Sequence, residues 1–414
     1  MVKKYLQMDV FTAAKARIRH ILENFEHFYV CFSGGKDSGV MTQMVLDVAK
    51  EMGVGPVPVL FYDWEAIYKE TEAFVRRIMS LPNIEPYWVC LPVQERNGSS
   101  VYEPFWMPWD PNKKNLWVRD FPPEAIHSGN TPSDWDWHQT EETDWHFFVH
   151  FGDWFARTRG ADRVANFVAI RTDESYDRMK MLKTRKHRDK LKDENGKILD
   201  WCYRFKENKK RVYYTMPIYD WRVGDVWKSV HEQDWDYNHI YDKFHLMGVP
   251  VHNMRICNPY GEQQKRGLHQ YHKCEPESWF RIVNRVTGAN FGNRYNHTAL
   301  TRGRIEKPVN ITWRKYLKLL LQSLPEDTRF HYRRNFLTAL KWHRKIRKQQ
   351  RLGQVLYDTD AECENIGVQD RFLLTWEEMA KCIIKGDYWC KKLCFTETQR
   401  EAKRQGTINK WKDI

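Results

Sequence analysis

The stretch FYVCF-SGGKDS-GVMTQMVLDVAK, residues 28–50, decides the fold. Its first part, Phe28–Phe32, is a short apolar run rich in β-forming residues and bounded by Gly34 and Gly35, a pattern that predicts a buried strand. The helical pattern begins at Ser38 and continues to about Met52. A glycine-rich turn between a buried strand and a helix is typical of a βα unit in an open α/β sheet.

The same alternation of strands and helices continues along the chain. Further strands are predicted at the run ending in Asp63, at Glu85–Val93 and at Val164–Ile170, and helices at 9–24, 66–79 and 145–159. Short connections between these elements favour parallel strands joined by right-handed crossovers. We therefore expect an α/β fold, a parallel sheet with helices on both faces.

Two regions interrupt or follow this alternation. Residues 94–143 are rich in Pro, Asn and Asp and lie in a part of the chain that has seven tryptophans between Trp106 and Trp154. This aromatic content is wrong for a disordered segment, so we expect an ordered insertion whose tryptophans either stack a base or, our preferred interpretation, pack a small core. The sequence predicts a nucleotide-binding domain at 1–260 and a mainly helical, basic domain at 261–414.

The charge of the chain is positive and unevenly distributed. The 414 residues carry a net charge of +13, while 178–211 alone carries 14 basic and 5 acidic residues and 301–351 carries 15 and 3. Such patches suggest nucleotide phosphates or a nucleic-acid backbone as ligands, although solvated helix faces give the same pattern. No apolar run approaches the ~20 residues of a membrane helix, and the N-terminal residues resemble no secretion signal. We expect a cytoplasmic protein without a membrane partner.

The hexapeptide Ser33–Ser38 has the chemistry of an anion cradle. Glycines let the backbone turn tightly and approach a ligand, and the following helix N-terminus presents free N–H groups and a partial positive charge. The serine hydroxyls and Lys36 add donors for phosphate oxygens. The loop lacks the GxxxxGK[ST] pattern of a Walker A motif, and a simple capped turn is the alternative interpretation.

Polar residues at the ends of other strands face the same edge of the predicted sheet. Asp63 ends the second strand, and Arg171 and Asp173 follow the fourth, so they are expected near Asp37 in one crevice. Asp37, Asp63 and Asp173 could hold Mg²⁺, although Asp63 and Asp173 could equally cap helices. Arg171 and Arg178 could neutralise charge on a phosphate, or form surface ion pairs.

The motif SGGKDS resembles the PP-loop of the ATP pyrophosphatase superfamily, whose fold is adenine nucleotide α-hydrolase-like and Rossmann-like. Within it, the chain is similar to the phosphoadenosine phosphosulfate (PAPS) reductase family, which includes the catalytic subunit of ATP sulfurylase. Agreement continues at Ile170–Ser175 with Arg178, at Pro217–Trp227 and at Tyr237–Asp242. Pieces of the insertion and the C-terminal part, such as Trp117-Val118-Arg119 and Asp387–Lys391, resemble one branch, the IbrA-like proteins.

This resemblance implies an enzyme that binds ATP with Mg²⁺, cleaves its α–β bond and adenylylates an acceptor, sulfate by analogy. Lys36, Asp37, Arg171 and Arg178 would be catalytic. The nucleotide would be bound by Ser33, Gly34, Gly35, Lys36, Asp37, Ser38, Asp63, Asp173 and Glu174.

Two alternatives stay open. The chain could be a PAPS reductase-like enzyme of sulfur metabolism, with a 3′-phosphate pocket at Lys180–Arg188. However, in the string that most resembles the family's catalytic motif, Lys265–His269, Arg266 stands in place of the catalytic cysteine. Cys257 and Cys274 are its remaining thiol candidates. Alternatively, the chain could be a nucleotide-gated regulator that binds nucleic acid through 301–351, since IbrA-like proteins tend to accompany a ParB-like partner.

Overall fold

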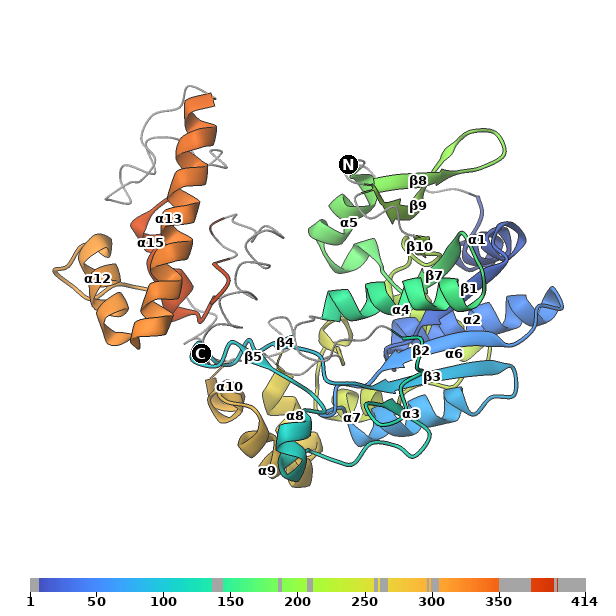
Figure 1. Ribbon diagram of the computed structural model, residues 1–414, viewed down its shortest axis with the longest axis horizontal. Coiled ribbons are helices and arrows are strands. Elements are labelled where there is room, and N and C mark those ends of the chain that lie inside the picture. Colours follow the sequence, from blue (N-terminus) through green and yellow to red (C-terminus); the bar gives the residue numbers. More distant parts are fainter. Residues whose placement is uncertain are drawn as a thin grey trace. The chain divides into compact units, whose positions relative to one another are not determined.

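One mixed sheet organises the N-terminal two thirds of the chain (Figure 1). The computed structural model describes residues 7–135, 144–184, 188–206, 211–256, 260, 267–295, 298, 305–349, 374–390 and 393. In spatial order, the strands are β6 (Ile126–His127), β3 (Ile84–Cys90), β2 (Val57–Tyr62), β1 (His27–Cys31), β7 (Val164–Val168), β10 (Val212–Thr215), β9 (Ile198–Phe205) and β8 (Arg188–Lys192).

The centre of this sheet is parallel and one edge is antiparallel. β1 pairs in parallel with β2 and with β7, and the parallel arrangement continues to β6 on one side and to β10 on the other. β9 and β8 then add an antiparallel hairpin. Because the first strand in sequence lies in the middle, the turn after β1 opens at the carboxyl ends of neighbouring parallel strands, where α/β folds bind ligands.

Helices cover both faces of the sheet, as expected. On one face, Phe28 and Val30 of β1 belong to a core that includes residues of α1 (Val10–Asn24), α2 (Lys36–Glu51), α3 (Lys69–Met79) and α6 (Val223–Glu232). On the other face, the alternate residue Tyr29 packs against α4 (Asp144–Thr158). Successive side chains of a strand point to opposite faces of its sheet, so the alternate residues of β1 pack against helices on both faces. This arrangement confirms the predicted α/β fold.

One segment differs from its prediction. The charged region Arg171–Arg211 is expected to be loop and helix, and it does begin with α5 (Tyr176–Lys183), but β8 and β9 follow as an antiparallel hairpin. The turn at 194–196 lies where it is predicted, with Gly196 at φ +75°. The strand pattern of β8 is concealed because Arg188, Lys190 and Lys192 alternate along it where apolar residues would be expected, and charged residues are frequent on edge strands.

The described part of the insertion is ordered but contains little regular structure. It holds the two-stranded sheet of β4 (Glu95–Arg96) and β5 (Phe105–Trp106), a 3₁₀ segment at Pro111–Leu116, and β6. Trp109 and Trp117 are buried, and their rings meet edge to face with centroids 5.4 Å apart. Both rings also contact the ring of Phe121. These tryptophans are packing residues, as the preferred interpretation has it, but Trp109 and Trp117 join the main core of the sheet instead of a small core of their own; Trp137 lies outside the described residues.

The chain divides into two compact units. The first comprises 1–95, 107–259 and 273–281, and the second comprises 96–106, 260–272 and 282–414. The first unit contains the sheet and also α7 (Ile240–Leu246). The remaining helices are α8 (Leu268–Cys274), α9 (Pro276–Arg285), α10 (Ala289–Tyr295), α12 (Trp313–Ser323), α13 (Glu326–Gln349) and α15 (Trp376–Ile384). None of the described helices has both the length and the apolar character needed to cross a bilayer.

Candidate functional site

The turn between β1 and α2 has a backbone shape that depends on glycine. Gly34 adopts φ +71°, and a Cβ atom there would lie 2.7 Å from the methyl carbon of Thr71. The side-chain amide of Asn238 donates to the Gly34 carbonyl at 2.8 Å and to the Thr71 hydroxyl at 2.9 Å. The turn is therefore fixed from two sides, and only glycine fits its first bend.

The two serines of the loop hold its ends together. The Ser33 N–H donates to the Ser38 hydroxyl oxygen at 3.1 Å, and the two hydroxyl oxygens lie 2.9 Å apart. Ser38 also donates to the Gly35 carbonyl at 3.2 Å. The Ser38 hydroxyl thus closes the loop, and Ser33, which bonds to it, is exposed.

The loop amides have the character of an anion site. No hydrogen-bond acceptor among the described residues meets the backbone N–H groups of Gly34, Gly35, Asp37 or Ser38. Gly35 caps α2 without a side-chain hydrogen bond, so the helix dipole adds its partial positive charge at this point. Converging, unpartnered N–H groups at a helix start are the feature by which proteins bind phosphate groups.

A part of the same unit covers the loop. The backbone N–H of Lys36 donates to the Tyr241 hydroxyl at 3.0 Å, and the Lys36 ammonium donates to the Met254 carbonyl at 3.0 Å. Lys36 is only 6% exposed and Tyr241 only 3%. The sequence predicts an open cradle, whereas α7 and the segment before Ile256 lie across it. The Tyr241 hydroxyl and the Met254 carbonyl accept the hydrogen bonds that a bound phosphate would otherwise accept from Lys36.

Charged side chains form a network at the start of α2. The Asp37 carboxylate accepts a hydrogen bond from Arg171 Nε at 2.6 Å and lies 3.4 Å from the Lys36 ammonium. Arg171 reaches to within 3.7 Å of Glu174, which also pairs with Arg178 at 2.6 Å and with Arg255 at 3.8 Å. Four cations thus face two carboxylates, and this local excess of positive charge suits an anionic ligand.

All four predicted catalytic residues therefore lie in one network. Lys36, Asp37, Arg171 and Glu174 are in direct contact, and Arg178 joins them through Glu174. Sequence reasoning missed Arg255, which no pattern indicates. It also gave no role to Asn238 and Tyr241, although both lie in the stretch Tyr237–Asp242 that carries the family resemblance.

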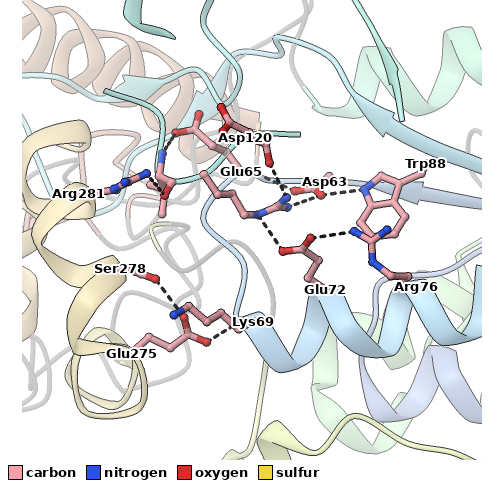
Figure 2. Close-up of polar contacts among 12 residues, drawn as sticks. Asp63, Glu65, Lys69, Glu72, Arg76, Trp88, Asp120, Glu275, Ser278 and Arg281 are labelled. Carbon is pink, nitrogen blue, oxygen red and sulfur yellow. Dashed lines mark hydrogen bonds and ion pairs between the residues drawn. The ribbon is translucent and has the colours of Figure 1, made fainter. Parts of the chain in front are cut away.

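Asp63 has a different place from the one predicted (Figure 2). Its carboxylate is fully buried and accepts hydrogen bonds from the Glu65 backbone N–H at 2.9 Å, from the Trp88 indole N–H at 2.8 Å and from Arg119. It does not cap a helix, since α3 begins after Tyr68. With its oxygens engaged by three donors, Asp63 fastens the sheet edge to the insertion.

Neighbouring groups extend this buried cluster. Glu65, at φ +64°, accepts the backbone N–H groups of Trp109 at 2.7 Å and Val118 at 3.0 Å. The Arg119 guanidinium also lies 3.7 Å from Glu72. Burial lowers the pKa of Arg119, but the charges of Asp63 and Glu72 outweigh this effect and raise the pKa above its usual value. Arg119 is therefore a permanent cation held inside the protein by two carboxylates.

The described residues do not form a magnesium site of their own. Nowhere in the described part of the chain do three or more His, Cys, Asp or Glu side chains lie close enough to hold a metal ion. Asp63 is turned to Arg119, and Asp37 is paired with Arg171, so the expected trio of Asp37, Asp63 and Asp173 is not brought together. A Mg²⁺ ion here would depend mainly on phosphate oxygens and water.

The thiol and lysine candidates are not poised for chemistry in the described residues. Burial raises the pKa of the half-buried Cys274 thiol to about 11, which disfavours the reactive thiolate. Cys257 and part of Lys180–Arg188 lie outside the described residues. Within that stretch, Lys183 pairs with Asp200 at 2.9 Å, and Lys190, just after it, contacts the same carboxylate.

Two family matches and one full-length relative place this chain among known proteins. Residues 27–100, which include the loop, match the phosphoadenosine phosphosulfate reductase domain, and residues 248–349 match a domain of unknown function, DUF3440. The chain is 33% identical to the uncharacterized protein YbdN of Escherichia coli (strain K12) over 401 residues, which cover 95% of this chain and 92% of that protein. The chain belongs to the YbdN family.

The predicted resemblance to the PAPS reductase family is thereby confirmed for residues 27–100, and in this chain the DUF3440 match follows at 248–349, while the IbrA-like branch stays a prediction. Solved structures give weaker likenesses. An FMN adenylyltransferase of Candida glabrata with FAD and pyrophosphate shares 14% identity over 58% of this chain and 63% of its own, with a TM-score of 0.32. A PAPS reductase of Candida auris in a phosphate complex shares 12% identity over 59% of this chain and 94% of its own, with a TM-score of 0.28.

A tRNA thiolase, NcsA of Methanococcus maripaludis, shares 12% identity over 75% of this chain and 85% of its own, with a TM-score of 0.29. This chain spans less than two thirds of the adenylyltransferase. At TM-scores this low, none of the three likenesses carries an argument about the reaction.

Proposed function

We propose that this protein binds ATP with its β- and γ-phosphates at the Ser33–Ser38 loop and cleaves the α–β bond. The observation that carries the proposal is the group of four loop N–H groups without an acceptor among the described residues, next to Lys36 and Arg171. The family match over residues 27–100 supports an adenine nucleotide as the ligand.

The reaction assigns a role to each part of the network. An acceptor oxyanion attacks the α-phosphorus, the bond from this phosphorus to the bridging oxygen breaks, and the electron pair leaves with pyrophosphate. No redox partner is needed. The loop amides and Lys36 stabilise the charge of the leaving pyrophosphate, and Arg171 and Arg178 neutralise charge on the α-phosphate. Sulfate is one candidate acceptor, and water would give AMP.

A phosphate that binds at the loop must displace the two acceptors that the chain itself provides there. A phosphate oxygen that accepts the Lys36 N–H takes the position of the Tyr241 hydroxyl, and a phosphate that pairs with the Lys36 ammonium replaces the Met254 carbonyl. Each exchange gives the donor an acceptor of higher negative charge, and hydrogen bonds to charged groups are stronger than those to neutral ones. The nucleotide therefore competes with the protein's own atoms for this site.

The test measures binding and product identity together. ATP labelled in the α-phosphate is incubated with the full chain, with and without sulfate, in the presence of inorganic pyrophosphatase, and the labelled product is separated from ATP. Parallel titrations use ATP and inorganic pyrophosphate without pyrophosphatase. Lys36→Ala removes the loop cation, and Lys50→Ala, at the exposed far end of the same helix, is the matched control.

The expected result is a labelled AMP or adenylyl product, with pyrophosphate binding weakened at least about 10-fold in Lys36→Ala and unchanged in Lys50→Ala, because a charge-assisted hydrogen bond contributes about 1.5–3 kcal/mol. Labelled ADP would show cleavage at the β–γ bond and contradict the proposal. Equal binding of pyrophosphate to both variants would remove the loop from it.

One observation favours a second candidate, a PAPS reductase-like activity: the matched family itself. That reaction needs two electrons from thiols to release sulfite. Cys257→Ser and Cys274→Ser, assayed for sulfite release from PAPS with a dithiol reductant, distinguish the two. Full sulfite release by both variants excludes these thiols, and the raised pKa of Cys274 leads us to expect that its variant keeps whatever activity is present.

A further inference from the structure

Helix α13 of the second unit has two contrasting faces. One face is buried in a core shared with α12 and α15, and its members recur at the helical spacing of three or four residues. They include Tyr332, Phe336, Ala339, His343 and Arg347. The helix is thus held by its apolar side, and the opposite side is presented outward.

The outward face carries a group of exposed cations. Arg333, Lys341, Arg344, Lys345 and Lys348 are exposed, and none pairs with a carboxylate in the described part of the chain. From residue 328 to 349 the sequence holds eight Lys or Arg residues and no Asp or Glu. On an ordinary solvated helix, lysines and arginines alternate with acids three or four positions away, so this face keeps a strong positive field.

We propose that this face of α13 binds the phosphate backbone of duplex DNA. At a rise of 1.5 Å per residue the five cations extend over about 22 Å, and an α-helix fits the major groove, which is about 12 Å wide. Lysine and arginine are the side chains that most often contact DNA phosphates. Two exposed apolar residues on the same face, Phe330 (67% exposed) and Leu337 (57%), add contacts with sugars or thymine methyl groups.

An anionic membrane is the other large polyanion, and the packing of α13 argues against it. A helix that lies on a membrane inserts its apolar face into the lipid. In α13 the apolar residues Tyr332, Phe336 and Ala339 are already buried in the core shared with α12 and α15, and the exposed Phe330 and Leu337 lie among cations instead of forming a continuous apolar face. This inference concerns a different unit and a different ligand from the proposed nucleotide reaction, so the two can fail independently.

The experiment uses the full chain and a fluorescein-labelled 24-base-pair DNA duplex, with binding followed by anisotropy from 50 to 250 mM salt. The test variant is the double substitution Lys341→Ala and Arg344→Ala. The control removes the same charge from the first unit, by Lys50→Ala with Lys228→Ala, both exposed. Alanine is the best helix former, so neither double variant should lose its helix, and thermal unfolding verifies this.

The expected result is a linear fall of the logarithm of the association constant with the logarithm of salt, with a slope of about −4.5, since each of the five phosphate contacts contributes about −0.9. The test variant reduces this slope by about 2 and weakens binding about 10-fold or more at 150 mM salt, and the control leaves both unchanged. Equal losses in both variants, or binding to phosphatidylglycerol vesicles without binding to the duplex, would overturn the proposal.

Discussion

The hydroxyl oxygen of Tyr241 lies 3.0 Å from the backbone nitrogen of Lys36 and accepts the first N–H of helix α2. The two residues are 205 positions apart in the sequence. A neutral hydroxyl thus occupies an acceptor position that a phosphate oxygen would take in the proposed reaction. In the proposed reaction, Tyr241 is therefore a direct competitor of the nucleotide phosphate for the loop.

Replacing Tyr241 by phenylalanine tests this competition with almost no change of volume. We expect Tyr241→Phe to bind pyrophosphate and ATP about 5-fold more tightly, because a net hydrogen bond of about 1 kcal/mol no longer has to be broken. Isothermal titration measures the gain. Tyr237→Phe is the control, since its hydroxyl bonds Asp242 instead of the loop. Weaker binding by Tyr241→Phe would mean that the hydroxyl serves the nucleotide.

The bend at Gly34 leads to a prediction about stability. Gly34→Ala places a Cβ 2.7 Å from the Thr71 methyl carbon and keeps a residue at φ +71°. Gly53→Ala is a matched control, because Gly53 has φ +67° and no atom within 4 Å of its Cβ position. We expect about 1 kcal/mol of destabilisation in the control from the backbone alone, and 1–3 kcal/mol more in Gly34→Ala from the clash.

Urea unfolding of the two glycine variants separates these contributions, and pyrophosphate titration adds the functional measurement. The loop variant is expected to lose binding while the control keeps it. If both variants lose the same stability, the contact with Thr71 has no energetic consequence, and the turn is not fixed in the way that its hydrogen bonds from Asn238 indicate.

The buried cluster around Asp63 allows the structural role and the predicted metal role to be separated. Asp63→Asn keeps the shape but removes the charge opposite Arg119, which leaves an incompletely paired buried cation. We expect a loss of about 3–5 kcal/mol in the free energy of unfolding. Asp236→Asn, in the exposed pair with Arg77, should cost less than about 1 kcal/mol.

A second substitution makes the test of Asp63 sharper. Arg119→Met in the Asp63→Asn background removes the unpaired cation, so it should recover part of the lost stability, measured by urea unfolding of the single and double variants. If Asp63→Asn were as stable as the parent but lost nucleotide turnover, the metal-ligand hypothesis from the sequence would be preferred over the arrangement in the structure.

The parts of the fold that could be predicted are those that depend on local pattern. The apolar run Phe28–Phe32, its glycines and the following helix are adjacent in sequence, so strand, turn and helix are correctly predicted together. The hairpin of β8 and β9 was missed because β8 carries charged residues in place of an apolar alternation, so β9 had no recognisable partner strand beside it in the sequence.

The site was harder to predict because its decisive contacts are between distant residues. Arg171 reaches Asp37 across 134 positions and Asn238 reaches Gly34 across 204, and no local pattern states such pairings. Parallel-strand topology correctly suggested that Arg171 would lie near the loop. It could not show that Asp63, at the end of the neighbouring strand, would turn to Arg119, since that partner comes from an insertion without periodicity.

His331 in the second unit gives a prediction about pH. Its ring stacks on Tyr388 with centroids 3.6 Å apart, and burial, with a smaller effect of the nearby Arg334 charge, lowers its pKa to about 4. In the unfolded chain the pKa is near 6.5, so between these values only the unfolded state binds the proton. Stability is therefore lost as the pH falls from about 6.5 toward 4, by an amount on the order of 2 kcal/mol at pH 5.

His331→Phe keeps an aromatic ring against Tyr388 and removes the titrating group. Thermal unfolding of the full chain at pH 7 and pH 5 compares the variant with the parent, so that effects of other titrating groups cancel. We expect the parent to lose more of its unfolding midpoint than the variant on acidification, by roughly 2–4 °C per kcal/mol. Equal losses would show that the ring is protonated as readily in the folded protein as in the unfolded chain.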